Sequence, residues 1–201
     1  MPFLTILTRV HPGRPKCLQG NIKSVLAQTD PDVEHLLLYP PDEKGMDVIK
    51  AGPLIHWAQP KVTGQYVMML DDDDRLATPD FVHDLKALAK DANFDMVIFR
   101  SELGDWICPP DKYWNARAIV LSNIAGPCVV VKREIYELCS DQWLRPIYAS
   151  DFFYIKAAFS FSRRVFWWDY IGTETQGTER NNRGKGEEFI TFKGEQNDTK
   201  Y

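Results

Sequence analysis

The sequence predicts an α/β protein with a mostly parallel central sheet flanked by helices. A strand pattern, a helical pattern and a second strand pattern follow one another over residues 3–39, and such a strand-helix-strand unit joins parallel strands. Short apolar runs continue to alternate with helical patterns up to about residue 170. The composition, 44% hydrophobic and 26% charged over 201 residues, is that of a globular domain with a sizeable core.

The first half of the chain supplies the strand-helix-strand unit. Residues 3–8 (FLTILT) form the first expected strand, and Pro15 opens a helix whose apolar residues recur at helical spacing to about Gln28. After an Asp-Pro-Asp turn, residues 33–39 (VEHLLLY) form the second strand. Residues 40–63 carry four prolines and are ambiguous.

The middle of the chain repeats the alternation. Residues 66–70 (YVMML) read as a buried strand. Thr78 is expected to cap the next helix, with Pro79 at its first position and Asp80 near its positive end. Residues 96–99 (MVIF) form another strand.

The second half adds fewer and more widely spaced elements. A strand is expected at 128–132, a helix at 133–139 and a helix from Ser150 to about Ser160. Residues 164–170 (RVFWWDY) read as the final strand.

The chain divides into a folded part and a polar end. We expect one domain over residues 1–172, followed by a polar C-terminal tail or lid over 173–201 that is rich in glycine. Residues 180–183 (RNNR) could close over a phosphate group as a lid, and a plain disordered tail is the alternative.

Charge and cysteine usage exclude several classes of protein. A net charge of −4 and a pI of about 5.6 argue against a nucleic-acid partner. No apolar run approaches the roughly 20 residues of a transmembrane segment, and the N-terminus does not resemble a signal peptide. Four scattered cysteines indicate buried reduced thiols rather than a zinc site. We therefore expect a cytoplasmic protein, in the host cytoplasm if it is virus-encoded.

Four consecutive aspartates, Asp71 to Asp74, directly follow the strand at 66–70. Two like charges ~4 Å apart repel by roughly 1 kcal/mol in water and about 4 kcal/mol near a protein surface, so something must offset this repulsion. Ligands of open α/β sheets bind beyond the carboxyl ends of the strands, and a divalent cation would neutralise the cluster. An acidic turn that leads into a helix is the structural alternative.

Other metal and phosphate motifs do not fit this stretch. An EF-hand loop that starts at Asp71 would need Gly and Glu where the chain has Leu76 and Val82. A P-loop is absent, since no Gly-rich stretch ends in Lys-Ser or Lys-Thr.

Three stretches together carry a resemblance to a known family. They are Ser24–Thr29 (SVLAQT) with the following Pro31-Asp32, residues 64–76 (GQYVMMLDDDDRL) with Pro79-Asp80, and, more weakly, residues 126–134 followed by Ser150-Asp151. With these, roughly residues 3–160 resemble the GT-A-fold glycosyltransferases of the family 2-like inverting group, which use nucleotide-diphosphate sugars.

The resemblance implies a role for the aspartates. In the family, a D-x-D pair holds Mn²⁺ or Mg²⁺ against the donor diphosphate and also contacts the ribose. Counting from Leu70 makes Asp71 and Asp73 the pair, whereas counting back from Pro79 makes it Asp72 and Asp74. We favour the first count, with Asp73 as the main metal ligand, Asp71 and Asp74 beside it, and Asp71, Asp72 and Asp73 facing the donor.

The rest of the donor site follows from the same resemblance. The family binds the base and ribose with the loop after the first strand, here Thr8, Arg9 and His11, and with an acid after the second strand, here Asp42. The surroundings of Asp42 depart from the Asp-Asp-Gly-Ser pattern of the family. A UDP-sugar is the favoured donor on family grounds.

An inverting transfer needs a general base for the acceptor hydroxyl. Asp151, at the start of an apolar helix, matches the family position, although a carboxylate there also suits a helix N-terminus. Asp141 and Asp169 are the alternative bases. Trp106 and Trp168 are candidates for the acceptor groove, because aromatic faces pack against sugars.

The expected function is thus a metal-dependent, inverting transfer of a sugar from a nucleotide-diphosphate donor to a hydroxyl of a glycan or other acceptor. A nucleotidyltransferase would want a Gly-rich basic loop after the first strand, where Gly13 is the single glycine. A non-catalytic sugar-nucleotide or glycan-binding module is the other alternative, and donor hydrolysis separates it from the enzyme.

Overall fold

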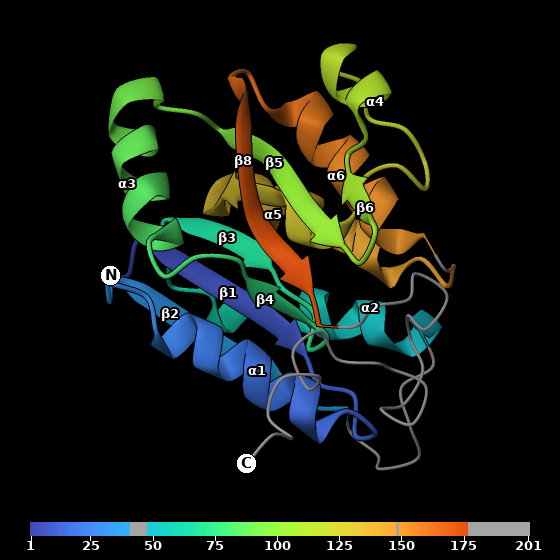
Figure 1. Ribbon diagram of the computed structural model, residues 1–201. Helices are drawn as coiled ribbons and strands as arrows, with labels where there is room; N and C mark the ends of the chain where they lie inside the picture. The colour runs from blue at the N-terminus through green and yellow to red at the C-terminus, as the bar shows by residue number, and fades with distance from the viewer. Residues whose placement is uncertain (41–47, 148, 177–201) are drawn as a thin grey trace.

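The computed structural model describes residues 1–40, 48–147 and 149–176, which have an α/β fold (Figure 1). A central eight-stranded sheet has the order β2-β1-β3-β7-β5-β8-β4, with β6 paired to β5. The strands are β1 (Leu4–Arg9), β2 (Val33–Leu38), β3 (Tyr66–Met69), β4 (Asp74–Leu76), β5 (Met96–Leu103), β6 (Trp106–Cys108), β7 (Val129–Lys132) and β8 (Val165–Thr175). The helices are α1 (Pro15–Leu26), α2 (Val48–Trp57), α3 (Phe81–Ala92), α4 (Asp111–Asn115), α5 (Arg133–Cys139) and α6 (Ser150–Phe161). Three short 3₁₀ turns, η1 (Gln59–Lys61), η2 (Gly126–Cys128) and η3 (Ser140–Leu144), complete the described part.

The central sheet flanked by helices is as the sequence predicted, but its strand pairing is mixed, with three parallel and four antiparallel pairs among the described strands. β1 runs parallel to both β2 and β3, and β5 runs parallel to β8. β7 lies between β3 and β5 and is antiparallel to both. Strands β2, β1, β3, β5 and β8 therefore point the same way, and the short β4 and β6 pair antiparallel to β8 and β5.

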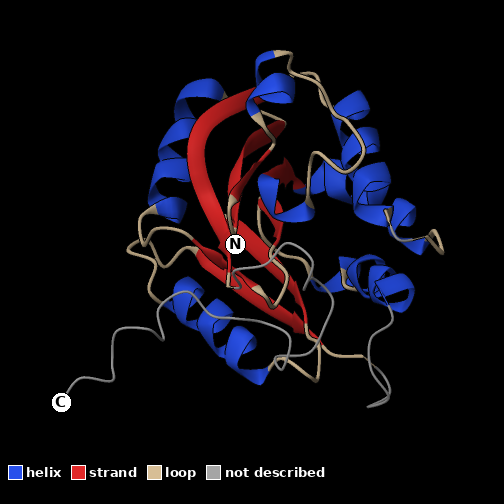
Figure 2. Ribbon diagram, turned by 45° about the vertical axis from the view of Figure 1, so that its right-hand side comes forward, coloured by secondary structure: helices blue, strands red, loops and turns tan. Residues whose placement is uncertain are grey.

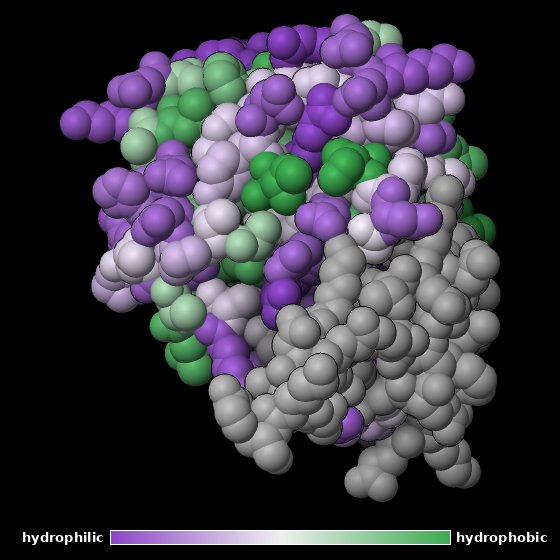
Figure 3. Space-filling view, in the orientation of Figure 1, coloured by the Kyte–Doolittle hydropathy of each residue, from purple (hydrophilic) through white to green (hydrophobic). Residues whose placement is uncertain are grey.

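Helices cover both faces of this sheet (Figures 1 and 2). One core cluster joins Ile6 of β1 to Val25 of α1 and Phe81 of α3. The other joins Leu7 of β1 to Ile55 of α2, to α5 and to α6. Successive residues of β1 thus point to opposite faces. With the apolar side chains drawn into these clusters, the surface seen in Figure 3 is largely hydrophilic, with small apolar patches.

Two further expectations concern the chain as a whole. All four cysteines are buried free thiols, as the sequence predicted. Among the helices of the described residues, none has the length and apolar character needed to cross a membrane.

The helix expected to begin at Pro79 begins at Phe81 instead. The Thr78 hydroxyl hydrogen-bonds the Tyr170 hydroxyl at 2.7 Å rather than capping the helix. The backbone carbonyl of Pro79 accepts a hydrogen bond from the Thr29 amide at 2.8 Å. The chain is therefore still tied to the end of α1 at these positions, and Asp80 becomes the N-cap residue.

The largest differences from the expected elements lie at β8 and in the proline-rich segment. β8 continues to Thr175, past residue 170, where the strand was expected to end, and past residue 173, where we placed the start of the tail. It is held there by β4, a strand whose polar sequence gave no strand signal. Residues 48–57 form α2 even though Pro53 lies inside it. Residues 177–201, including the expected lid at 180–183, lie outside the described residues.

Candidate active site

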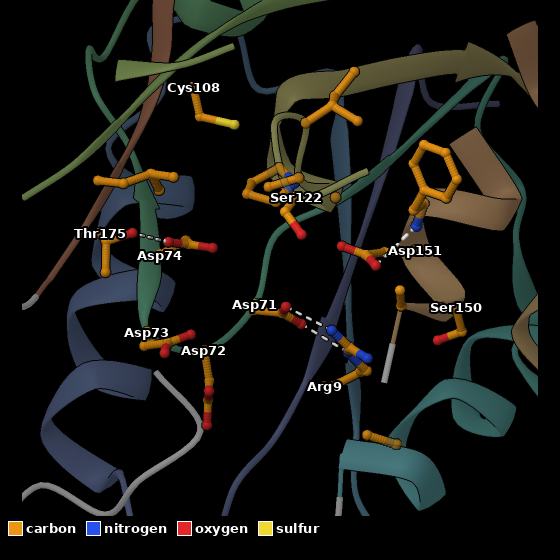
Figure 4. A pocket seen from close by; sticks show the side chains of 18 of the residues that line it. Arg9, Asp71, Asp72, Asp73, Asp74, Cys108, Ser122, Ser150, Asp151 and Thr175 are labelled. Atoms are coloured by element: carbon orange, nitrogen blue, oxygen red, sulfur yellow. Dashed lines mark hydrogen bonds and ion pairs between the residues drawn. The ribbon is translucent and has the colours of Figure 1, made fainter. Parts of the chain in front are cut away.

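A cavity of about 510 Å³ opens at the carboxyl end of the parallel strands (Figure 4). β1 ends at Arg9 and β3 at Met69, so the loop 10–14 and the turn 70–73 both face this edge. The cavity is lined by Arg9, His11, Arg14, Ala51, Asp71, Asp72, Asp73, Asp74, Leu103, Trp106, Cys108, Leu121, Ser122, Ile124, Ala125, Gly126, Pro127, Ala149, Ser150, Asp151, Phe152 and Thr175. All four aspartates therefore lie where ligands of α/β sheets bind.

Arg9 offsets the charge of the first aspartate. Its Nε and Nη2 donate to the two carboxylate oxygens of Asp71 at 2.7 and 2.6 Å. Burial alone would raise the pKa of Asp71, but the Arg9 guanidinium outweighs it and holds that pKa below its usual value. The Arg9 guanidinium also lies 5.6 Å from the centre of the buried Trp143 ring, which is within the range of a cation–π contact.

Arg14 is the second cation of the acidic turn. It precedes Pro15 at the start of α1 and is 5% exposed. Its Nη1 lies 2.9 Å from Asp72 Oδ1 and 2.7 Å from Asp73 Oδ2. The backbone amide of His11 donates to the other oxygen of Asp72 at 2.6 Å.

These contacts do not fully balance the cluster. Burial raises the pKa of Asp72, and the neighbouring Asp73 carboxylate adds to this effect. Burial also raises the pKa of Asp73 despite its contact with Arg14. The Arg9 and Arg14 guanidinium groups thus do not fully offset the mutual repulsion of the carboxyl groups of the turn.

The backbone of the acidic turn is fixed from behind by polar side chains. The Asn21 side-chain amide of α1 donates to the carbonyls of Asp71 and Asp74 at 3.0 and 2.9 Å. The backbone amide of Gln176 donates to the Asp73 carbonyl at 2.7 Å. The Thr175 hydroxyl donates to Asp74 Oδ1 at 2.6 Å. Because the carbonyls are held in this way, the carboxyl groups of the turn line the cavity.

Asp151 lies across the cavity from the aspartate turn, in the first turn of α6. Figure 4 shows its carboxyl group on the side that faces Arg9 and Asp71. The backbone amide of Phe152 donates to Asp151 Oδ1 at 2.8 Å. Burial raises the pKa of Asp151, and the charge of Arg9 counteracts this only in part. Asp151 thus combines the features of a carboxylate base: burial, a raised pKa and access to the cavity.

The other residues expected to bind the donor do not all line the cavity. His11 lines the cavity, whereas Thr8 is fully buried behind it. The Thr8 hydroxyl donates to the Leu70 carbonyl at 2.7 Å and also contacts His35 Nε2 at 2.8 Å, which makes it a link between strands. Asp42 lies outside the described residues.

Of the two residues expected to bind the acceptor and the two alternative bases, one lines the cavity. Trp106 lines the cavity, but Trp168 lies on the other face of the sheet and stacks on Tyr170 with ring centres 4.1 Å apart. Asp141 is exposed outside the cavity. Asp169 is largely exposed and pairs with Arg100 at 3.0 Å. Of the three candidate bases, Asp151 is the one that lines the cavity.

The carboxylate oxygens of the acidic turn limit how a hard divalent cation would bind there. Within the described residues, no three or more His, Cys, Asp or Glu side chains are grouped to hold a metal ion by themselves. Mg²⁺ is commonly held by one or two carboxylates together with the phosphates of a substrate. Asp73 and its neighbours offer carboxylate oxygens at the cavity wall, and they therefore fit a cation that binds together with a diphosphate.

The sequence analysis did not single out Arg14, Asn21 or Gln176. A signal for Asn21 exists, because it lies four residues after Cys17 and four before Val25, and these three are the buried residues of α1. A polar residue in the buried stripe of a helix needs partners. Gln176 offered no such signal, since its contacts depend on how β8 pairs with β4.

Comparison with known proteins places the fold. No protein-family model matches the sequence, and no curated protein sequence matches it either. Solved structures do match. The S. aureus TarS crystal structure superposes with a TM-score of 0.66 at 12% identity over 86% of this chain. TarS 1–349 in complex with UDP-GlcNAc gives 0.65 at 12% identity over 86% of the chain. The fold of this chain is the GT-A fold.

The GT-A fold of the chain corresponds to part of each matched structure. The chain spans 36% of the TarS structure and 58% of TarS 1–349 bound to UDP-GlcNAc. TarS 1–349 in complex with UDP matches over 87% of this chain and 60% of that one, with a TM-score of 0.65 and 12% identity. The GT-A architecture expected from the sequence motifs is thus confirmed at an identity too low for sequence comparison to detect.

Proposed function

We propose that this protein is a glycosyltransferase that moves a sugar from a nucleoside-diphosphate donor, with UDP favoured, to a hydroxyl group of a glycan or other acceptor. The observation that carries the proposal is the placement of an acidic turn and a separate half-buried carboxylate, Asp151, on facing walls of one cavity. The crystal structures of TarS with UDP-GlcNAc and with UDP support the choice of donor.

The acidic turn and the loop after β1 form the donor side in this proposal. Asp73, with Asp71 and Asp74 beside it, would hold Mn²⁺ or Mg²⁺. Both oxygens of Asp72 already have partners, in the His11 amide and Arg14. When bound, the cation supplies positive charge for the departing nucleoside diphosphate. Arg9 keeps Asp71 ionised and in position. His11, at the cavity wall, is placed to contact the nucleoside.

Asp151 is the general base of the proposed reaction. It takes the proton from the acceptor hydroxyl while that oxygen attacks the anomeric carbon on the side opposite the diphosphate, so the anomeric configuration inverts. A raised pKa makes the carboxylate a stronger base at neutral pH. Ser150, which is buried beside it, also lines the cavity.

Calorimetry with the full chain tests the donor side. We expect UDP to bind in the presence of Mn²⁺ and to bind at least ten-fold more weakly in EDTA. Equal affinity under both conditions would rule out a bridging cation. Hydrolysis of UDP-GlcNAc without added acceptor then separates an enzyme from a binding module, because a module binds the nucleotide but releases no UDP. The variant Asp169→Asn changes an exposed carboxylate outside the cavity. It should bind and hydrolyse the donor as the unmodified chain does.

A further inference from the structure

The cavity has two chemically different halves. Every aspartate of the acidic turn, together with Arg9, His11 and Arg14, lies on the half formed by the ends of β1 and β3. The other half, which we name the apolar lobe, is formed by the β5–β6 hairpin, the segment 121–127 and the start of α6. Its apolar side chains are Leu103, Trp106, Leu121, Ile124, Pro127 and Phe152.

The apolar lobe contains no cation among the described residues. No Lys, Arg or His stands among its lining side chains, and its one carboxyl group is Asp151. The nearest guanidinium groups, Arg9 and Arg14, are engaged by Asp71, Asp72 and Asp73. A phosphate or carboxylate placed in this lobe would lose its hydration without a partner charge and would face Asp151.

The lobe instead offers apolar area to a ligand. Trp106 and Phe152 are flat aromatic surfaces on its wall, and Leu121 stands at the cavity rim with 49% of its surface exposed. Figure 4 shows Ser122 and Asp151 on the wall between this lobe and the Arg9–Asp71 pair. A ligand with an apolar face would therefore bury that face while a hydroxyl at its edge reaches Asp151.

We propose that the acceptor is an uncharged hydroxyl compound with an apolar or aromatic face, of the aryl glycoside type, and that acceptors with phosphate or carboxylate groups are rejected. The inference rests on the proposed function, because it assigns the apolar lobe to the acceptor of that reaction. Leu121 and Trp106 are the residues that would determine this specificity.

Ligand-observed NMR titration of the full chain with saturating UDP and the diamagnetic Mg²⁺ tests the inference. The probes are phenyl glycosides of glucose, galactose and N-acetylglucosamine, with their methyl counterparts and their phenyl 6-phosphates. We expect a phenyl member to bind at least ten-fold more tightly than its own 6-phosphate and more tightly than its methyl counterpart. Trp106→Ala should weaken the phenyl member at least five-fold.

A lysine introduced at the cavity rim is the second test of the inference. Leu121→Lys should bring the affinity of the 6-phosphate to within three-fold of the phenyl compound. Leu138→Lys, which changes a 56% exposed leucine on α5 away from the cavity, should leave the preference unchanged. Tighter binding of the 6-phosphates by the unmodified chain would overturn the inference. So would the failure of every phenyl glycoside to bind while UDP still binds, and loss of UDP binding would instead overturn the proposed function.

Discussion

Arg9 and Asp71 form a two-point ion pair, with Nε–Oδ1 and Nη2–Oδ2 distances of 2.7 and 2.6 Å, between the ends of β1 and β3. Both side chains are mostly withdrawn from solvent, at 15% and 27% exposure. The pair therefore holds together the two strand ends that carry the donor side of the cavity.

Breaking this pair should cost stability. Arg9→Met leaves Asp71 with a poorly compensated charge, and we expect the free energy of unfolding to fall by about 3 kcal/mol, at the lower end for a buried pair. Urea unfolding measures this fall in the free energy of unfolding. Asp71→Asn should cost a similar amount, and the double variant should cost less than the sum of the two. Strict additivity would show that the two side chains do not interact in solution.

Asp73→Ala should weaken both UDP binding and turnover. If Asp73 holds the cation, it stabilises the diphosphate in the ground state and in the transition state alike. Calorimetry should show that Mn²⁺ no longer strengthens UDP binding to this variant. Retention of the full Mn²⁺ effect would transfer the ligand role to Asp72 and Asp74, the other possible register of the motif.

The effect of Asp151→Asn should differ in kind from the effect of Asp73→Ala. The substitution is nearly isosteric and does not touch the donor side, so the Kd for UDP should stay near that of the unmodified chain. The rate constant kcat for transfer should fall roughly 10²- to 10⁴-fold. Full transfer activity in this variant would mean that the base is another group.

His35 should make stability depend on pH below neutrality. Burial lowers the pKa of His35 from its ordinary value of about 6.5 to about 4. The unfolded chain therefore binds a proton that the folded chain does not between pH 6.5 and 4, and stability falls as the pH falls through this window. Between pH 7 and pH 4.5, the free energy of unfolding should fall by less in the His35→Gln variant than in the unmodified chain. Parallel pH curves for the two proteins would contradict the assignment.

Two glycine-to-alanine substitutions should differ sharply. A Cβ at Gly172 of β8 would lie 2.5 Å from the Phe99 ring and 2.7 Å from the Phe81 ring, so Gly172→Ala should lower the free energy of unfolding by roughly 1–3 kcal/mol through overpacking. A Cβ at Gly126 would meet the Met69 side chain at 3.7 Å, an ordinary contact. Gly126→Ala is therefore the control, and its melting temperature should stay close to that of the unmodified protein.

Much of the fold was predictable because the buried strands carry their own signal. The apolar runs at 66–70 and 96–99 appear as β3 and β5 near the expected places. The position of the aspartates at the end of a strand followed directly from that assignment. The placement of Asp151 in the same cavity followed from the family resemblance, and not from any local pattern.

The contacts that complete the site were not predictable in the same way. β4 is a strand because β8 extends to pair with it, and a polar three-residue segment shows no such tendency alone. The same pairing positions Thr175 and Gln176 against the acidic turn. Trp168 was placed wrongly relative to the cavity by sequence inspection, because adjacent strand residues alternate in face and only the register decides which faces where.

The hydrogen bond between Thr175 and Asp74 joins residues that are 101 positions apart. At a translation rate of 5–20 residues per second, the acidic turn leaves the ribosome roughly 5–20 s before the strand that flanks it. During that interval the β4 segment is an unpaired edge that could capture another nascent chain. Its neighbouring carboxylates repel such a partner. We therefore expect the carboxylates of the acidic turn to disfavour pairing of this edge with another chain until β8 is complete.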